Sequence, residues 1–241
     1  MAQLKELVWT REMVTRFWDF ERTRQENFFS FQVGAVVARK FRKYFPSNAD
    51  IVDYGAGTGF LVEDLITSGI RCGAVEFGDD AVAGLNEQFC NHPLFLGAQS
   101  FEALNSWREK FDGAFLVEVV EHLYDDELST ALVCIRDLLK PGGVLIVTTP
   151  NEEDRSKNFV CSPESGFIFH RFQHVRSWSA ASLRAVLESY GYSCIETGTT
   201  DFTASALALR RTTPLPKRIL RSVAKLFTPR RPHLYVVVKR I

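Results

Sequence analysis

Short apolar runs alternate with helix-forming segments through the middle of the chain, and this alternation constrains the fold more than any other feature. The pattern predicts strands near 50–54, 71–76, 93–97, 112–117 and 143–149, and helices at 59–68, 79–90, 100–109 and 126–140. Because strands that alternate with helices are joined by right-handed crossovers, their sheet is mostly parallel and covered on both faces. We therefore expect an α/β fold with a doubly wound sheet.

The two flanks extend this pattern. Residues 1–49 carry aromatic and apolar side chains at helical spacing, which predicts an N-terminal helical cap in front of a main domain at 50–241. A helix at 179–190 precedes two last apolar runs, 192–202 and 233–241, and these runs bring the expected sheet to seven strands. The segment between the fifth strand and this helix is polar and long, which favours a lid or a substrate loop.

Charge is distributed unevenly along the chain. The 29 Lys and Arg residues balance the 29 Asp and Glu residues, yet ten of these bases and one acid lie from residue 201 onward, so that this part carries +9 and the rest −9. A basic helical insertion is expected at about 203–232, and its stretch 207–231 contains no acidic residue. This segment is expected to contact an anionic surface, to hold an anionic acceptor, or to pack as a solvated helix.

Composition bears on the class of protein and on its location. A hydrophobic content of 46% is ordinary for a globular enzyme. Five cysteines without a C-x-x-C pair are typical of reduced thiols, and they predict a cytoplasmic protein. No stretch approaches the ~20 apolar residues of a membrane span, and the acidic N-terminal region lacks the apolar core of a signal peptide. No transmembrane segment is therefore expected.

Three glycines follow the first predicted strand in "IVDYGAGTGF", residues 51–60. Gly55, Gly57 and Gly59 would let a ligand lie against the main chain, although glycine turns also serve to pack a strand on a helix. Glu76 ends the next strand, 21 residues after Gly55. A carboxylate there can accept hydrogen bonds from two ribose hydroxyls, as in dinucleotide sites, or it can cap the following helix.

A second cluster, "EVVEH", follows the fourth predicted strand at 118–122. One interpretation makes His122 a general base that is oriented by Glu118 or Glu121. Another adds His174 and forms a site for a divalent cation from two carboxylates and two imidazoles. A third gives these residues the structural role of organising the loop. Tyr124 and His170 are further candidates for a base.

The motifs together resemble the class I S-adenosylmethionine-dependent methyltransferases, whose first motif is an apolar residue, Asp and alternating glycines. After "IVDYGAGTGF", the matching segments are "FDGAFLVEVVEHL" (111–123), "LLKPGGVLIVTTPN" (138–151) and "SWSAASLRAVLESYGY" (177–192). The resemblance covers roughly 50–240 and is closest to the ubiquinone-biosynthesis O-methyltransferase branch. It implies a Rossmann-like sheet of seven strands and S-adenosylmethionine as the cofactor.

The same resemblance implies where the cofactor binds. The glycines would pass beneath its methionine part, Asp53 would anchor their loop, Glu76 would hold the ribose hydroxyls and Phe77 would lie against the adenine. Many relatives carry an acid after the third strand for the adenine amino group. This chain has none there, so Gln99 or Ser100 is expected to make that contact. The expected cofactor-binding residues are Asp53, Gly55, Gly57, Gly59, Glu76, Phe77, Gln99, Ser100, Val117 and Glu118.

The resemblance also implies an activity, the methylation of an oxygen atom on a small-molecule, saccharide or lipid-linked acceptor. Its expected catalytic residues are His122, Glu118, Glu121 and His174. No dedicated metal site and no nucleic-acid partner are expected. Two alternatives remain open at this point. One is a metal-dependent RNA 2′-O-methyltransferase, because the E-x-x-E-H pattern with a later His resembles the small-RNA methyltransferases. The other is a protein that binds the cofactor without turnover.

Overall fold

A seven-stranded sheet forms the centre of the molecule in the computed structural model, which describes residues 4–209 and 231–241. The strands lie in the order β4-β3-β2-β5-β6-β10-β9. The first five run parallel, and β10 is antiparallel to both of its neighbours. The predicted α/β fold is confirmed. The strands are β2 (Asp50–Tyr54), β3 (Arg71–Glu76), β4 (Phe95–Ser100), β5 (Phe111–Val117), β6 (Leu139–Pro150), β9 (Tyr192–Thr200) and β10 (His233–Arg240).

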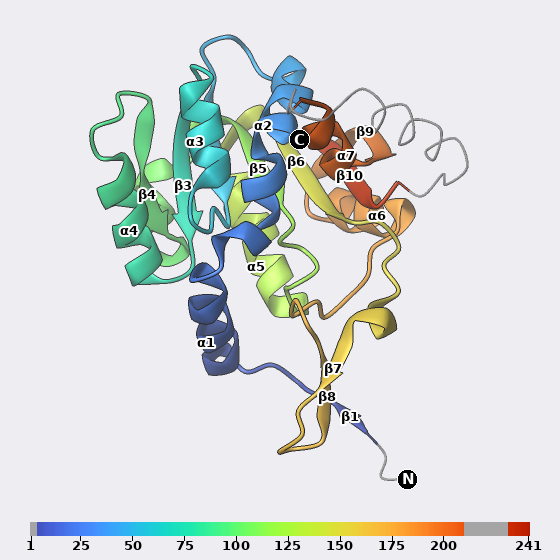
Figure 1. Cartoon of the computed structure of the whole chain (residues 1–241). Helices are drawn as coiled ribbons and strands as arrows, with labels where there is room; N and C mark the ends of the chain where they lie inside the picture. Colours follow the sequence, from blue (N-terminus) through green and yellow to red (C-terminus); the bar gives the residue numbers. More distant parts are fainter. Residues whose placement is uncertain (1–3, 210–230) are drawn as a thin grey trace.

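Helices cover both faces of this sheet (Figure 1). Because side chains alternate along a strand, Ile51 packs into the core on one face and its neighbour Val52 into the core on the other. The helices of the first face are α2 (Phe29–Phe41), α3 (Phe60–Thr67), α4 (Asp79–Phe89) and α7 (Phe202–Leu209). Those of the second face are the 3₁₀ helix η3 (Phe101–Trp107), α5 (Asp125–Leu138) and α6 (Ala180–Ser189).

The two helices of the N-terminal region differ in burial. Six residues of α2, among them Val33, Val37 and Phe41, are buried in the same core as the sheet. By contrast, α1 (Arg11–Arg22) has no buried residue and lies against the edge of the body. The 3₁₀ helix η1 (Gln25–Asn27) joins them, and η2 (Arg42–Tyr44) follows α2.

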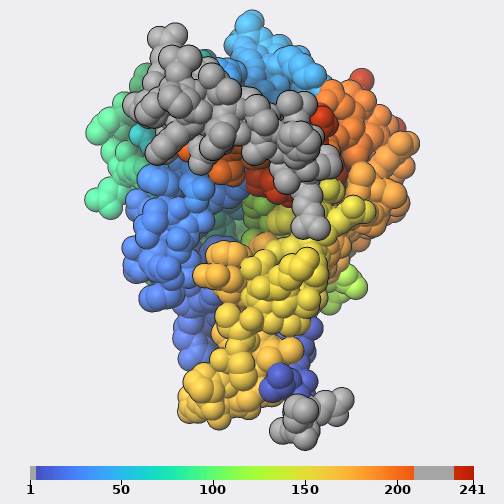
Figure 2. Space-filling view, turned by 45° about the vertical axis from the view of Figure 1, so that its right-hand side comes forward, coloured from blue at the N-terminus to red at the C-terminus, as the bar shows by residue number. Residues whose placement is uncertain are grey.

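Two segments form elements that the sequence pattern did not predict. The helix expected at 100–109 is the 3₁₀ helix η3, because Phe101, Leu104 and Trp107 recur every three residues and thus share one face at three residues per turn. The segment 151–178, expected to be irregular, contains the short helix η4 (Arg155–Asn158) and a hairpin of β7 (Phe159–Cys161) and β8 (Phe167–His170). β8 also pairs with β1 (Lys5–Glu6), and this small sheet projects from the body (Figure 2).

The strand order reverses between β2 and β5, which are neighbours in the sheet. From β2 the chain proceeds outward to β3 and β4, whereas β5 and β6 lie on the other side. In open α/β sheets, ligands bind at the carboxyl ends of the strands beside such a reversal. The glycine loop follows β2 and the "EVVEH" turn follows β5, so both predicted clusters meet at this position.

The predicted basic insertion lies only partly within the described residues. Its start coincides with α7, in which the Asp201 carboxylate accepts a hydrogen bond of 2.7 Å from the Ala204 N–H. Residues 210–230, which carry most of its positive charge, lie outside the described residues. Among the helices that are described, none is long and apolar enough to cross a membrane.

The burial of α2 leads to a prediction for stability. Phe41→Ala should lower the free energy of unfolding by about 3–5 kcal/mol, because Phe41 is fully buried and its removal leaves a cavity. Phe20→Ala on α1 is the matched control, and since Phe20 is 58% exposed we expect a change within about 0.5 kcal/mol. Urea denaturation monitored by circular dichroism measures both. Equal losses would contradict the assignment of α2 to the core.

Candidate functional site

The glycine loop after β2 forms a cradle at the carboxyl end of the sheet, and we call its residues 55–59 the cofactor cradle. Gly55, Gly57 and Gly59 have φ angles of 78°, 58° and 83°, in the left-handed region that favours glycine. A Cβ atom on Gly57 would lie 3.3 Å from the Phe28 ring, and one on Gly55 would lie 2.8 Å from Cγ2 of Val119. The cradle leads into α3, whose N-terminus presents backbone N–H groups to an anion.

Glu76 stands at the end of β3, directly beside the cradle. Its Oε1 accepts a hydrogen bond of 2.5 Å from the Gly57 N–H, and its Oε2 accepts one of 2.7 Å from the Phe77 N–H. An ionised carboxylate has about four acceptor positions, so lone pairs remain for a ligand. Burial raises the pKa of Glu76, and the two N–H donors oppose that shift. The position suits the predicted contact with vicinal hydroxyls.

Asp53 is buried one residue before the end of β2. Burial, together with the nearby Glu76 carboxylate, raises the pKa of Asp53 to about 8. Within the described part of the chain, its carboxylate makes none of the loop-anchoring hydrogen bonds that the family resemblance implies. The Asp53 carboxylate lies at the base of the cradle, and the N–H groups of the loop donate no hydrogen bond to it.

Two aromatic rings are stacked at the outer side of the cradle. The rings of Phe77 and Phe101 lie 5.3 Å apart with 9° between their planes, and the Arg11 guanidinium lies 4.7 Å from the centre of the Phe77 ring. Phe77 as a whole residue is 44% exposed. These contacts place an aromatic surface where the adenine is expected.

The two candidates for the adenine amino group are in different environments. The Gln99 amide faces η3. In the amide orientation that satisfies both of its polar atoms, the oxygen accepts a hydrogen bond of 3.1 Å from the Trp107 indole and the nitrogen donates one of 2.8 Å to the Ala103 carbonyl. Ser100 is the register partner of Glu76 in the sheet, directly beside the predicted ribose contact. The position of Ser100 therefore suits the adenine contact better than that of Gln99.

The carboxylates of the "EVVEH" turn are held by the neighbouring strand. Glu118 has a φ angle of 52°, and its Oε1 accepts a hydrogen bond of 2.9 Å from the Thr148 hydroxyl. Oε2 of Glu121 accepts one of 3.0 Å from the Thr149 hydroxyl, whereas its buried Oε1 has no partner among the described residues. Val117, the residue before the turn, is in register with Thr148. Both carboxylates are thus fixed at the end of β6.

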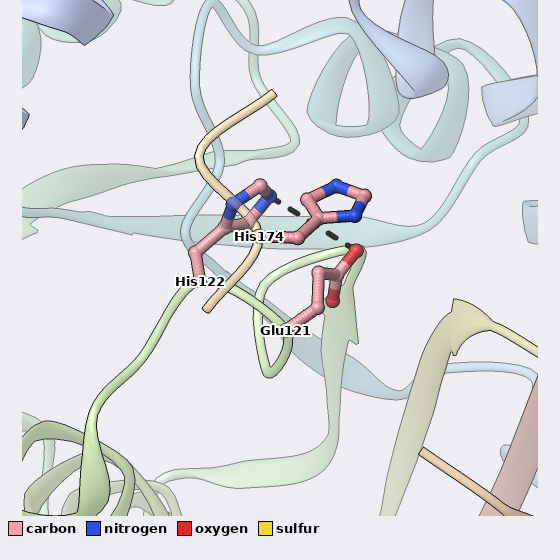
Figure 3. Close-up of side chains that lie close together, drawn as sticks. All are labelled: Glu121, His122 and His174. Atoms are coloured by element: carbon pink, nitrogen blue, oxygen red, sulfur yellow. Dashed lines mark ion pairs between the residues drawn. The ribbon is translucent and has the colours of Figure 1, made fainter. Parts of the chain in front are cut away.

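His122 and His174 complete this group (Figure 3). Nδ1 of His122 lies 3.4 Å from the Gln173 carbonyl, and its Nε2 lies 4.0 Å from Oε1 of Glu121. The rings of His122 and His174 are 4.9 Å apart. The structure thus brings together four residues that the sequence analysis selected, and we call them the acceptor-side cluster: Glu118, Glu121, His122 and His174.

Sequence analysis missed one residue of this region, Glu153. Its Oε2 lies 2.5 Å from Nδ1 of His174, and its Oε1 lies 3.2 Å from Nε2 of His170. The signal available in the sequence was an acid shortly after the apolar run of β6, at the same end of the sheet as the other carboxylates. The hydroxyl group of Tyr124, another candidate for a base, accepts a hydrogen bond of 3.1 Å from the backbone N–H of Trp9.

Burial shifts the protonation of the acceptor-side cluster. It raises the pKa of Glu118 to about 8 and that of Glu121 well above its usual value. Burial and the neighbouring His174 lower the pKa of His122 to about 3. Burial also opposes ionisation of Glu153, but hydrogen bonds from His170 and His174 hold its pKa well below the usual range. Glu153 is therefore the carboxyl group of the region that ionises most readily.

Two groups of side chains in the described ranges have donor atoms close enough to hold a metal ion. In each group the atoms lie within 4.8 Å of one another, and the groups are Glu121, His122 and His174, and Glu153, His170 and His174. In the second group, the Glu153 carboxylate is hydrogen-bonded to both histidine rings. In the first group, Oε1 of Glu121 has no hydrogen-bond partner among the described residues. A mixed carboxylate and imidazole set suits several divalent transition metals.

A family profile described as a methyltransferase domain matches residues 24–197, which is more than half of the chain and includes both the cradle and the acceptor-side cluster. The chain belongs to this methyltransferase-domain family. The predicted family is thereby confirmed. S-adenosylmethionine is the methyl donor of such domains, and the cradle suits it because the loop lies at the carboxyl end of the sheet with the Glu76 carboxylate beside it.

Known proteins resemble this methyltransferase domain in sequence and in fold. A ubiquinone biosynthesis O-methyltransferase of Dinoroseobacter shibae is 33% identical over 132 residues, which are 52% of this chain and 51% of that protein. The chain thus spans about half the length of this curated relative.

Two solved structures share the fold. One is a Burkholderia thailandensis 1,6-didemethyltoxoflavin-N1-methyltransferase with bound S-adenosylhomocysteine, with a TM-score of 0.62 and 14% identity over 99% of this chain and 94% of that one. The other is the [4+2]-cyclase SpnF, with a TM-score of 0.63 and 15% identity over 99% of each chain.

The raised pKa of Glu118 predicts a pH-dependent gain in stability for Glu118→Gln. Because the folded chain keeps a proton that the unfolded chain releases, the wild type loses stability relative to the variant as pH rises from about 4.5 to about 8. The loss should reach up to about 1.4 kcal/mol per pH unit and level off above pH 8. Urea denaturation in metal-free buffer at pH 5, 6.5 and 8 measures it.

Glu63→Gln is the matched control for this series, because Glu63 is exposed on α3 and its replacement removes a carboxylate from water rather than from the protein interior. A gain for Glu118→Gln that is the same at all three pH values would show that Glu118 is ionised in the folded protein. The interpretation of the cluster as largely uncharged would then be wrong.

Proposed function

We propose that this chain is an S-adenosylmethionine-dependent methyltransferase that methylates an oxygen atom of a small-molecule acceptor. The observation that carries the proposal is the contact between the two halves of the site. Val119, in the middle of the "EVVEH" turn, lies so close to the cradle that a Cβ atom on Gly55 would be 2.8 Å from it. Carboxylates and imidazoles therefore lie next to the place where the methyl donor binds.

Such a site suits the methylation of a hydroxyl group. The bound cofactor supplies a methyl group on a positively charged sulfur, and the acceptor oxygen must lose its proton as it reacts. His122 and His174 are the neutral bases of the acceptor-side cluster, because burial lowers the pKa of both. Glu118 and Glu121 belong to the same cluster, and each carboxyl group has hydrogen-bonding capacity beyond its bond from a threonine hydroxyl.

An aromatic wall connects the cradle with the cluster. Phe28 lies against Gly57, the rings of Phe28 and Trp18 are 6.2 Å apart, and the Trp18 ring meets the edge of His122 at 5.0 Å. Such a wall favours an acceptor with a flat or apolar portion beside its hydroxyl. We therefore propose a phenol or a lipid-linked phenol as the preferred acceptor, and a saccharide as the second choice.

The relative from Dinoroseobacter shibae, named as an O-methyltransferase, supports the choice of oxygen. It favours this proposal over an RNA 2′-O-methyltransferase and over a protein that binds the cofactor without turnover. The five cysteines are all unpaired, which supports a reducing, cytoplasmic location. The segment 207–231 is proposed to contact an anionic surface on the strength of its charge in the sequence.

The ribose contact gives a prediction that needs no acceptor. Glu76→Ala should weaken the binding of S-adenosylhomocysteine by about 1.5–3 kcal/mol for each lost hydrogen bond to the carboxylate. Isothermal titration calorimetry measures the affinity, and Glu102→Ala, which removes an exposed carboxylate from η3, is the control. If Glu76→Ala binds as tightly as the wild type, the assignment of Glu76 to the ribose is wrong.

The choice of acceptor is tested with a panel and a labelled cofactor. Purified protein with methyl-labelled S-adenosylmethionine should methylate a phenolic acceptor such as catechol, more slowly a methyl glycoside, and not a primary amine such as benzylamine. Glu121→Gln should lower the rate without changing the affinity for S-adenosylhomocysteine, since Glu121 lies on the acceptor side. Label that appears on the amine and not on hydroxyl acceptors would overturn the proposal.

A further inference from the structure

We propose that Glu153 is a positioning residue that makes His174 the proton acceptor for the incoming hydroxyl group. The inference rests on the proposed function, and it extends it to a residue that neither the family motifs nor the sequence pattern selected. It assigns separate roles to the two histidines of the acceptor-side cluster. The two roles follow from the position of the proton on each imidazole ring, and the hydrogen-bond partners determine that position.

The His170 ring fixes the orientation of Glu153. Nδ1 of His170 accepts hydrogen bonds from the backbone N–H groups of His174 at 3.2 Å and Phe172 at 3.3 Å, so the ring proton must be on Nε2. That N–H points to Oε1 of Glu153 at 3.2 Å, and the Asn158 amide donates to the same oxygen at 3.1 Å. His170 is only 1% exposed, which leaves this arrangement little freedom.

Glu153 in turn fixes the ring of His174. Because a carboxylate accepts and does not donate, Nδ1 of His174 must carry the proton that bridges the 2.5 Å to Oε2. The lone pair of the neutral ring is then on Nε2. This nitrogen has no hydrogen-bond partner among the residues of the described ranges, and the His174 side chain is 10% exposed. The ring thus presents an unoccupied proton acceptor.

His122 is arranged differently. Its Nδ1 lies 3.4 Å from a backbone carbonyl, that of Gln173, and not from a carboxylate. A carbonyl can orient a neutral imidazole, but it stabilises an imidazolium less than a carboxylate does. The Trp18 ring, whose indole donates to the Gln173 side chain at 3.2 Å, also packs on His122. We therefore assign proton acceptance to His174 and the shaping of the acceptor pocket to His122.

The reaction step balances on these residues. The proton of the acceptor hydroxyl moves to Nε2 of His174 while a lone pair of the hydroxyl oxygen forms the new bond to the methyl carbon. The carbon–sulfur bond breaks and its electron pair stays on sulfur, so the positive charge leaves sulfur and appears on the imidazolium. Glu153 stabilises that charge through the Nδ1–H bond. After product release, the imidazolium returns its proton to water.

The tautomer of His174 can be measured without any acceptor. Long-range proton–nitrogen NMR spectra of histidine-labelled protein with S-adenosylhomocysteine should show a protonated Nδ1 and an unprotonated Nε2 for His174, assigned from a His174→Gln sample. In Glu153→Ala this preference should shift toward protonated Nε2, whereas Glu152→Ala, with an exposed side chain on the same segment, should leave it unchanged. A wild-type His174 that is protonated on Nε2 overturns the proposal, whether or not a variant folds.

Kinetics give the second test, with catechol as the acceptor. Glu153→Gln should lower kcat by roughly 100-fold or more, while KM for S-adenosylmethionine stays within about twofold, since only the stabilisation of the imidazolium is lost. Glu152→Gln is the control and should retain wild-type kcat. A Glu153→Gln variant with unchanged kcat overturns the proposal. Failure of the wild type on every acceptor would refute the proposed function, whereas the NMR result decides independently whether Glu153 sets the tautomer of His174.

Discussion

The close contact of Gly55 with Val119 is the constraint on which the rest of the site depends. Because residue 55 lacks a side chain, the loop after β2 can lie against the turn after β5, where a Cβ atom would come within 2.8 Å of a methyl group. The contact joins the two strand ends at the reversal of strand order, which is where open α/β sheets bind ligands. Methyl transfer requires donor and acceptor in line at short range, so in the proposed function this contact would bring the two halves of the site together.

The same end of the sheet gathers buried acids at a cost in stability. Asp53 and Glu121 are buried and Glu118 is partly buried, and burial raises the pKa of each. The neighbouring strand offsets part of this cost, since the hydroxyl groups of Thr148 and Thr149 donate to two of these carboxylates. Ionisable groups that stay buried although their desolvation costs free energy are typical of functional sites. The site therefore reduces the stability that the two hydrophobic cores provide.

Sequence analysis could predict the sheet because periodicity and glycine spacing are local signals. The glycines, Glu76 and the "EVVEH" turn each follow directly on a strand, so the strand pattern alone brings them together. Glu153 was missed because its role depends on His174, 21 residues further along a segment without a clear pattern. The hairpin of β7 and β8 and the 3₁₀ helix η3 were missed for a related reason. Three-residue strands and three-residue spacing give too few repeats to distinguish from a loop or an α-helix.

The fold of the sheet alone does not specify a reaction. A [4+2]-cyclase and an N-methyltransferase share its fold at 15% and 14% identity, so the sheet by itself does not determine which reaction occurs. Helix α1 has no buried residue, yet its Trp18 packs on His122 and its Arg11 lies over Phe77. Helix α1 thus touches both the acceptor-side cluster and the aromatic rings beside the cradle. Because such a helix can vary without disturbing the core, selectivity for the acceptor is expected to reside in α1 and in the hairpin beside it.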